Sequence, residues 1–195
     1  LRDGSNLRIT IARYYTPSGR CIQRPYNGKY EDYMADEERF TNNELYVQDK
    51  SKIADSLKFK TLKGRIVYGG GGIQPDVFVP FDSSGTSFYL TSLQFSGAFT
   101  AFSFDYVNGK RSNWKDAKSF NEQFIVDEKL SKEFTNFAEK QFKVAFNTKE
   151  YQHSKKNIAK ILKAEIARQI WTEEGFYRTI NPLDVELTTA LKELK

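Results

Sequence analysis

Alternating apolar and polar residues near the start of the chain predict a β-strand. The apolar side chains of Leu7, Ile9 and Ile11 recur with a period of two, so a strand is expected over residues 7–15. Asp3-Gly4 directly before it is a hairpin-turn signal. A strand needs a hydrogen-bonding partner along its edge, which the two residues before that turn are too short to supply. We therefore expect the chain to be a piece of a longer protein, cut just upstream of Leu1.

Turn signals continue the β pattern to about residue 82. Residues 16–19, Thr-Pro-Ser-Gly, fit a type I turn and precede a short strand over residues 21–23. The run KFKTLKGRIVYGGGGIQPDVFVP predicts a hairpin that turns at Lys63-Gly64, then a four-glycine loop and an extended segment fixed by two prolines. No helix follows the glycines, so they favour close backbone approach or positive φ over a phosphate cradle.

A tyrosine-rich and charged insertion separates these two β regions. It covers residues 25–57, with short helices expected around Tyr33–Phe40 and Lys52–Leu57. We expect this insertion to lie over the β core rather than to form part of it.

From about residue 83 the apolar spacing becomes helical. After a linker, SSGTS, one buried helix is expected over residues 88–102, and further amphipathic helices over 127–146 and 150–174. Asn181 is expected to cap a last helix that begins at Pro182 and carries Leu183, Leu187, Leu191 and Leu194. The predicted fold class is α+β: a β-rich domain over residues 1–82 and a helical domain, a small four-helix bundle, over 83–195.

The composition is that of a folded protein. The 195 residues are 39% hydrophobic and 15% aromatic, which is ample for a packed core. No apolar run reaches the roughly 20 residues that a membrane span needs, so no membrane span is expected. The single cysteine, Cys21, excludes an internal disulfide and any multi-cysteine metal site, and is interpreted as a small hydrophobic strand residue rather than a reactive thiol.

The net charge of +5 is concentrated in one helical stretch. Residues 110–170 carry 14 basic and 8 acidic residues. Nucleic-acid binding is not expected, because no aromatic-interleaved or arginine-rich motif accompanies these lysines, which read first as the solvated faces of helices.

Candidate catalytic groups are sparse. The only histidine, His153, lies on the polar side of a lysine-rich helix start, and the one SxxK match, Ser112 to Lys115, lies in a polar connection. Carboxylates show no paired spacing, and no zinc or calcium ligand pattern occurs. These residues offer no complete active site, and no metal or cofactor is expected.

Two long motifs nevertheless resemble a known enzyme family. LRDGSNLRITIARYYTPSGRCIQ and GRIVYGGGGIQPDVFVP resemble the segment that follows the catalytic lysine in the carboxyl-terminal processing, or tail-specific, serine peptidases. The resemblance covers residues 1–24 and 58–80 well and Phe104–Arg111 in part, and the other helical residues only loosely. The insertion and the helical tail go beyond the minimal core of that family.

The resemblance implies a periplasmic or otherwise extracytoplasmic endopeptidase with a serine nucleophile and a desolvated lysine as general base. In the family a domain upstream, typically of the PDZ type, captures peptide or protein substrates by strand addition. The serine, lysine and assisting glutamine precede the LxDGS turn, which is residues 1–5 here. No catalytic role therefore falls on this chain, which is expected to be inactive alone.

Some roles stay open. Tyr14 and Tyr15 are the candidates for substrate binding, either as walls of the substrate cleft or as hydrogen-bonded aromatics at the core edge. Asp76 is expected to be a turn or cap group, since it has no partner carboxylate in sequence. The alternative function is a non-catalytic binding or assembly module that docks a partner or a second copy through the helical tail.

Overall fold

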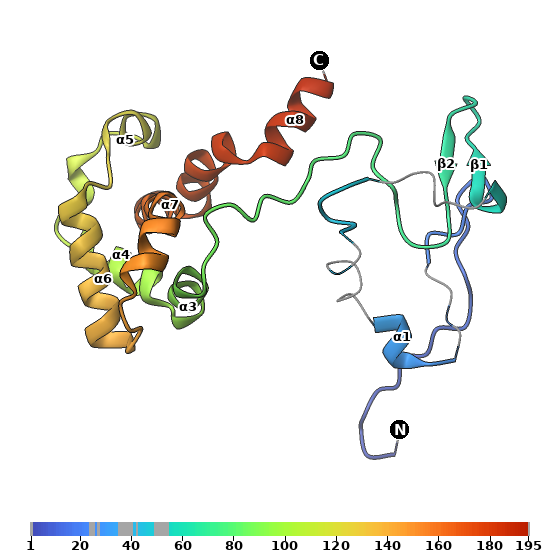
Figure 1. The fold of residues 1–195 in the computed structure, drawn as a ribbon, viewed down its shortest axis with the longest axis horizontal. Helices are drawn as coiled ribbons and strands as arrows, with labels where there is room; N and C mark the ends of the chain where they lie inside the picture. The colour runs from blue at the N-terminus through green and yellow to red at the C-terminus, as the bar shows by residue number, and fades with distance from the viewer. Residues whose placement is uncertain are drawn as a thin grey trace. The chain divides into compact units, whose positions relative to one another are not determined.

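The computed structural model describes residues 2–23, 26, 28–34, 41, 43–48 and 55–194. The chain divides into two compact units, Leu1–Phe81 and Asp82–Lys195; in Figure 1 the first is coloured blue to green and the second green to red. The first unit is mostly loops around a small sheet, and the second is helical.

The sheet of the first unit is an antiparallel hairpin. Strand β1 (Lys58–Lys60) pairs with β2 (Ile66–Tyr68), and Phe59 lies opposite Val67. The amide of Gly64 donates to the carbonyl of Thr61 at 2.8 Å, and Gly64 has a φ of +79°. A glycine is suited to this left-handed position of a hairpin turn, so the predicted hairpin at Lys63-Gly64 is confirmed.

A second hairpin turn repeats the same geometry with a related sequence, Thr-x-x-Gly-Arg. The amide of Gly19 donates to the carbonyl of Thr16 at 2.8 Å, and the amide of Thr16 donates to the carbonyl of Arg20 at 2.9 Å. The predicted turn over residues 16–19 is therefore confirmed. The short strand expected after it is reduced to one isolated bridge between Tyr15 and Cys21.

The strand predicted over residues 7–15 is not formed. Residues 6–14 make no backbone hydrogen bond with any other backbone group in the described part of the chain, and only Tyr15 takes part in a bridge. The alternating pattern supplies a strand with two faces, but a strand is stable only with a partner on its edge.

The four-glycine loop packs closely on neighbouring backbone. The amide of Gly70 donates to the carbonyl of Cys21 at 3.2 Å, and that of Gly72 to the carbonyl of Ile22 at 2.9 Å. A Cβ on Gly69 would lie 3.1 Å from Cγ of Arg20 and 3.2 Å from the Cys21 carbonyl. The glycines thus serve close approach and positive φ, as predicted, and these amides already have carbonyl acceptors.

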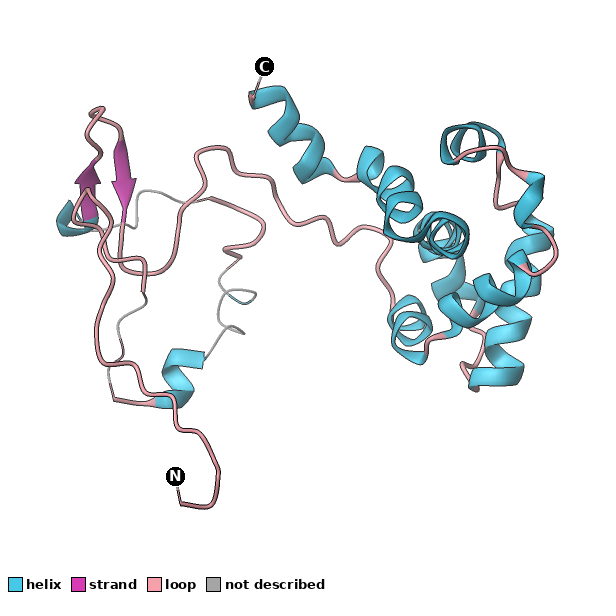
Figure 2. Ribbon diagram, turned by 180° about the vertical axis from the view of Figure 1, so that it is seen from behind, coloured by secondary structure: helices cyan, strands magenta, loops and turns pink. Residues whose placement is uncertain are grey.

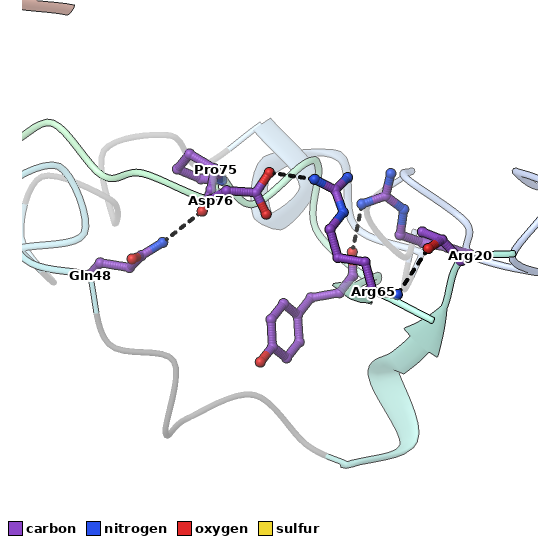
Figure 3. A network of polar contacts seen from close by, with 7 residues as sticks. Arg20, Gln48, Arg65, Pro75 and Asp76 are labelled. Carbon is purple, nitrogen blue, oxygen red and sulfur yellow. Dashed lines mark hydrogen bonds and ion pairs between the residues drawn. The ribbon is translucent and has the colours of Figure 1, made fainter. Parts of the chain in front are cut away.

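The insertion is described only in part. It contains helix α1 (Tyr30–Met34) and the 3-10 turn η2 (Asp55–Leu57), whereas residues 35–40 and 52–54 of the two expected helices lie outside the described residues. Residues 43–48 lie against the extended segment that follows the glycines. The Phe81 amide donates to the Leu45 carbonyl at 2.8 Å, and Gln48 Nε2 donates to the Pro75 carbonyl at 3.1 Å (Figure 3).

The second unit consists of helices joined by short loops, cyan and pink in Figure 2, and the longest helix is α7 (Thr148–Ile180). Helix α7 contacts α3, α4 and α5, and α4 also contacts α6. The α-helices are α3 (Phe88–Ser96), α4 (Ala98–Val107), α5 (Ala117–Gln123), α6 (Glu128–Phe142), α7 (Thr148–Ile180) and α8 (Val185–Glu193), with 3-10 turns η3 (Arg111–Asn113) and η4 (Asn181–Leu183).

The single helix predicted over residues 88–102 is wrong, because Gly97 divides it into α3 and α4. Gly97 has a φ of +82° and ends one helix where the next begins. The expectation that this stretch is buried is met only in part. Leu93 is fully buried, but Phe88 is 80% and Phe95 is 88% exposed. These two phenylalanines are seven positions apart and lie on one outward face of α3.

Aromatic rings fill the centre of the helical core. Phe134 of α6 stacks on Phe99 of α4 with ring centroids 4.6 Å apart, and meets Phe102 edge-on at 5.4 Å. At the other end, Phe120 of α5 lies 5.5 Å from the ring of Trp171. Most of the predicted apolar stripe of residues 127–146 and that of 150–174 therefore form core. The predicted bounds differ: α6 ends at Phe142, which leaves Phe146 42% exposed, and α7 continues beyond 174.

Helix α7 is bent where Trp171 and Thr172 leave helical geometry. Thr172 has a φ of +57° and a ψ of −147°, a conformation that β-branched residues seldom adopt. After this kink the chain folds back so closely that a Cβ on Gly175 would overlap the carbonyl oxygen of Ala167. The close approach explains the glycine in a helix.

The last helix begins later than predicted. Asn181 and Pro182 lie in η4, and α8 starts at Val185 after Asp184, whose carboxylate accepts from the Leu187 amide at 2.8 Å. The expectation that Asn181 caps a helix beginning at Pro182 is wrong, because Asp184 supplies the N-terminal carboxylate.

The fold class is α+β in a coarse sense: a mostly helical chain with a small two-stranded antiparallel sheet. Within the described ranges no helix combines the length and apolar character that crossing a membrane requires.

Candidate functional site

The candidate functional site in the first unit is the extended segment of residues 6–14. Its apolar side chains are uncovered, with Leu7 and Ile9 each 68% and Ile11 94% exposed. An extended chain with free backbone groups and apolar side chains can add a strand from another segment. The segment is therefore a candidate strand-pairing edge.

Both ends of the edge are fixed by turns. At its start, the carboxylate of Asp3 accepts from the amide of Ser5 at 3.0 Å and from its hydroxyl at 2.7 Å, and these hydrogen bonds lower the pKa of Asp3. At its end, the bridge between Tyr15 and Cys21 joins the edge to the Thr16–Arg20 turn. The register of anything that pairs with residues 6–14 is thus set by two local structures.

A groove of about 810 Å³ runs beside this edge. Residues 8–13 line it together with tyrosines of the insertion, Tyr26, Tyr30 and Tyr33. The Tyr26 and Tyr33 rings meet edge-on with centroids 5.7 Å apart. Aromatic walls beside an extended backbone suit the side chains of a bound peptide. Sequence reasoning missed these tyrosines as site residues, although the tyrosine-rich composition of the insertion was a signal.

Tyr14 and Tyr15, the sequence candidates for substrate binding, lie at the end of the same segment. Tyr14 is 87% and Tyr15 is 62% exposed, and neither lines this groove. Their predicted role in substrate binding stays a prediction.

Charged contacts join the two Thr-x-x-Gly-Arg hairpins to the rest of the unit (Figure 3). Arg20 Nη1 donates to the carbonyl of Tyr68 at 3.3 Å, which ties the first hairpin to β2. Arg65 Nη1 lies 2.8 Å from Oδ2 of Asp76. Asp76 thus holds the extended segment after the glycines, and sequence reasoning missed Arg65 as its partner. The pair is exposed, so its contribution to stability is small.

The other sequence candidates do not form a catalytic centre. Ser112 and Lys115 are both exposed, as is His153. A lysine that acts as a general base needs a desolvated amine, which an exposed side chain does not have. Within the described ranges, no three His, Cys, Asp or Glu side chains gather where they could hold a metal ion.

Comparison with known proteins bears on the helical unit. A family model described as "Family of unknown function (DUF8443)" matches residues 89–172. The match starts inside α3 and ends at the kink of α7. It lies outside residues 1–24 and 58–80, on which the expected relation to the peptidases mainly rests, and it includes Phe104–Arg111. No curated protein and no solved structure matches the chain.

Proposed function

We propose that this chain contributes the C-terminal part of a serine endopeptidase of the serine-lysine type, one that processes proteins near their C-termini. The proposal is supported by the two motifs over residues 1–24 and 58–80 and by one structural observation. That observation is the edge at residues 6–14, which has no strand partner among the described residues and whose alternating apolar side chains are exposed.

In this proposal the edge pairs with a strand that descends from the catalytic lysine. Because side chains alternate along a strand, a shift of one residue would turn every side chain of that partner to the opposite face. The register of residues 6–14 would then decide whether the lysine amine reaches the serine hydroxyl. The chain's own contribution is to position the base, and the reactive groups come from a segment outside these 195 residues.

The lysine would serve as base only if its amine is kept from water, since desolvation lowers its pKa and lets it accept the serine proton. Paired residues 6–14 would exclude water from one side of the ribbon. The proposed setting is extracytoplasmic, and the proposed substrate is an extended protein or peptide tail.

A peptidase assay on the gene product that contains this sequence tests the proposal. We expect cleavage of an unstructured C-terminal peptide by the complete gene product and none by the 195-residue chain alone. Ile9→Pro should abolish cleavage, because proline removes a backbone donor from the edge. Ile73→Pro, at an exposed loop position, is the control. Turnover by the chain alone, or an inactive complete product that is folded, would refute the proposal.

The alternative, an assembly module, concerns the helical unit. It is favoured by the outward face of α3, where Phe88 and Phe95 are exposed. Sedimentation velocity checks it: self-association of this chain that Phe95→Ser removes would support assembly through α3, and a monomer at all concentrations would count against it.

A further inference from the structure

A second groove lies on the helical unit, away from the candidate edge in sequence. It has a volume of about 540 Å³, within the usual range for ligand sites. Three parts of the helical unit form its walls. They are the first half of α7, the segment after the kink that comprises the end of α7 and η4, and the connection between α5 and α6. The kink of α7 therefore creates the groove, because it brings the second half of the helix back beside the first.

Asn121 at the end of α5 holds the walls together. Lys163 Nζ donates to the Asn121 carbonyl at 2.8 Å, and the Thr179 hydroxyl donates to Asn121 Oδ1 at 2.7 Å. Thr179 is buried, and burial lowers the pKa of Lys163. Asn121 thus links α5 to both halves of α7, through its main-chain carbonyl to Lys163 and through its side chain to Thr179, so the groove is formed before any ligand binds.

Cations line the groove and no carboxylate does. Its charged lining residues are Lys156, Lys160, Lys163 and Arg178. Arg178 Nε is paired with Glu174 at 2.8 Å, whereas Lys156 and Lys160 have no ion pair with any described carboxylate. Two lysines on successive turns of α7 are therefore without an ion pair in the described part of the chain, although hydrogen bonds from Ser84 and, to a lesser extent, the nearby Lys160 lower the pKa of the Asp82 carboxyl.

The remaining lining is largely apolar. Ile125 is 76% and Leu183 is 48% exposed; the first lies in the connection between α5 and α6 and the second in η4. One aromatic residue, Phe124, also lines the groove, but it is only 9% exposed and its ring stacks on Phe120, so it offers little open face on which a nucleic-acid base could stack. Ile125 and Leu183 suit a bulky aliphatic or aromatic side chain, with carboxylates on either side reaching the lysines.

We propose that this groove binds an extended peptide segment of a partner protein in which acidic residues flank a bulky apolar residue. The apolar residue packs between Ile125 and Leu183, and the acidic residues face Lys156 and Lys160. This assignment depends on the charge complementarity and shape of the helical unit alone, and it is independent of the proposed peptidase.

Fluorescence anisotropy with three labelled heptapeptides tests the pairing of charge and apolar contact. The probe is Glu-Glu-Ala-Leu-Ala-Glu-Glu, with one control in which Gln replaces every Glu and one in which Ser replaces Leu. We expect the full chain to bind the probe and each control at least about tenfold more weakly, because both contacts contribute to affinity. Binding of the probe should also weaken as salt is raised.

Matched variants locate the site. Lys160→Glu and Lys149→Glu make the same charge change at exposed positions of α7, but only Lys160 lines the groove. We expect Lys160→Glu to weaken probe binding about tenfold and Lys149→Glu less than about twofold. Ile125→Ser should weaken it without lowering the melting temperature, since that side chain is mostly exposed.

Three results would overturn the proposal. The first is that the probe fails to bind the folded chain. The second is that Lys160→Glu and Lys149→Glu weaken binding equally, which would mean that the peptide is attracted nonspecifically to the net charge. The third is that an oligodeoxythymidylate or an anionic phosphatidylglycerol vesicle binds with the same dependence on Lys160 while the probe does not. That result would assign the groove to nucleic acid or lipid.

Discussion

Nη1 of Arg168 lies 2.7 Å from Oε1 of Glu165, one turn before the kink of α7. Glu165 is only 7% exposed, and its Oε2 has no hydrogen-bond partner among the described residues. Arg168 also lies 3.2 Å from the carboxylate of Glu173 and 3.7 Å from the centre of the Phe176 ring. Its guanidinium therefore links the two halves of α7 across the kink.

This arrangement makes stability depend on pH through Glu165. Burial raises the pKa of Glu165 above its ordinary value of 4.5; Arg168 opposes that rise and Glu173 adds to it. A carboxyl with a raised pKa in the folded state binds protons more tightly when folded. Its contribution to stability is therefore present below pH 4.5 and lost as the pH rises through the folded pKa.

Glu165→Gln removes that titration and isolates its effect. Gln resembles the protonated form of Glu165, so the wild type should gain stability relative to Glu165→Gln as the pH falls. We expect the melting temperature of the wild type minus that of Glu165→Gln to be larger at pH 4.5 than at pH 7. Circular dichroism at the two pH values measures it, with Glu174→Gln, whose side chain is 67% exposed, as the control. A difference that shrinks on acidification would mean that Arg168 dominates and that the pKa is lowered instead.

Replacing Gly175 by alanine should have the opposite effect from the one that helix propensity predicts. Gly→Ala inside a helix normally stabilises by roughly 0.5–1 kcal/mol. Here the added methyl group would overlap the backbone of Ala167, so we expect Gly175→Ala to lower the free energy of unfolding by about 1–3 kcal/mol. Urea unfolding followed by circular dichroism measures it, with Lys149→Ala, an exposed site on the same helix, as the control. Stabilisation by Gly175→Ala would mean that the halves of α7 separate easily.

The sequence predicted which residues of the helical unit are helical and buried better than it predicted where helices end or bend. The apolar spacing of α6 and of the first part of α7 identified core residues such as Phe134 and Leu162. The break at Gly97 was hidden because apolar residues continue on both sides of it, and the kink at Thr172 because nothing local disfavours a helix there. Gly97 is itself a local signal for a helix end, which the apolar residues around it outweighed in the prediction. The kink depends on the tertiary approach of the two halves of α7, which local propensity does not encode.

In the first unit, turns were predictable and pairing was not. Thr-x-x-Gly-Arg specifies a turn by its own chemistry, and both copies form one. The alternation over residues 7–15 specifies only which side chains share a face. Pairing of that segment depends on another stretch of chain. The sequence indicated that the residues before the Asp3-Gly4 turn are too short to pair with it, but not that residues 6–14 would form no strand among the described residues.

The start of α8 provides a direct comparison of a sequence prediction with the structure. The sequence pattern favoured Asn181 as the cap, whereas Asp184 accepts the Leu187 amide. Asp184→Ala should lower the free energy of unfolding by about 1 kcal/mol, and Asn181→Ala by less than about 0.5 kcal/mol. Thermal unfolding of both variants checks it, and the reverse order would restore the helix start at Pro182.

The exposed edge predicts how the chain behaves at high concentration. Ile11 and Leu62 are each 94% exposed, but Ile11 lies on the unpaired extended segment and Leu62 in the β1–β2 turn. An open edge with apolar side chains templates pairing with other chains, and a lysine there opposes it. We expect Ile11→Lys to reduce sheet-type aggregation of the chain several-fold, and Leu62→Lys to leave it almost unchanged. Thioflavin T fluorescence over a concentration series measures the difference. Equal reductions by the two variants would show that exposed apolar area alone drives association, and that residues 6–14 have no special readiness to accept a strand.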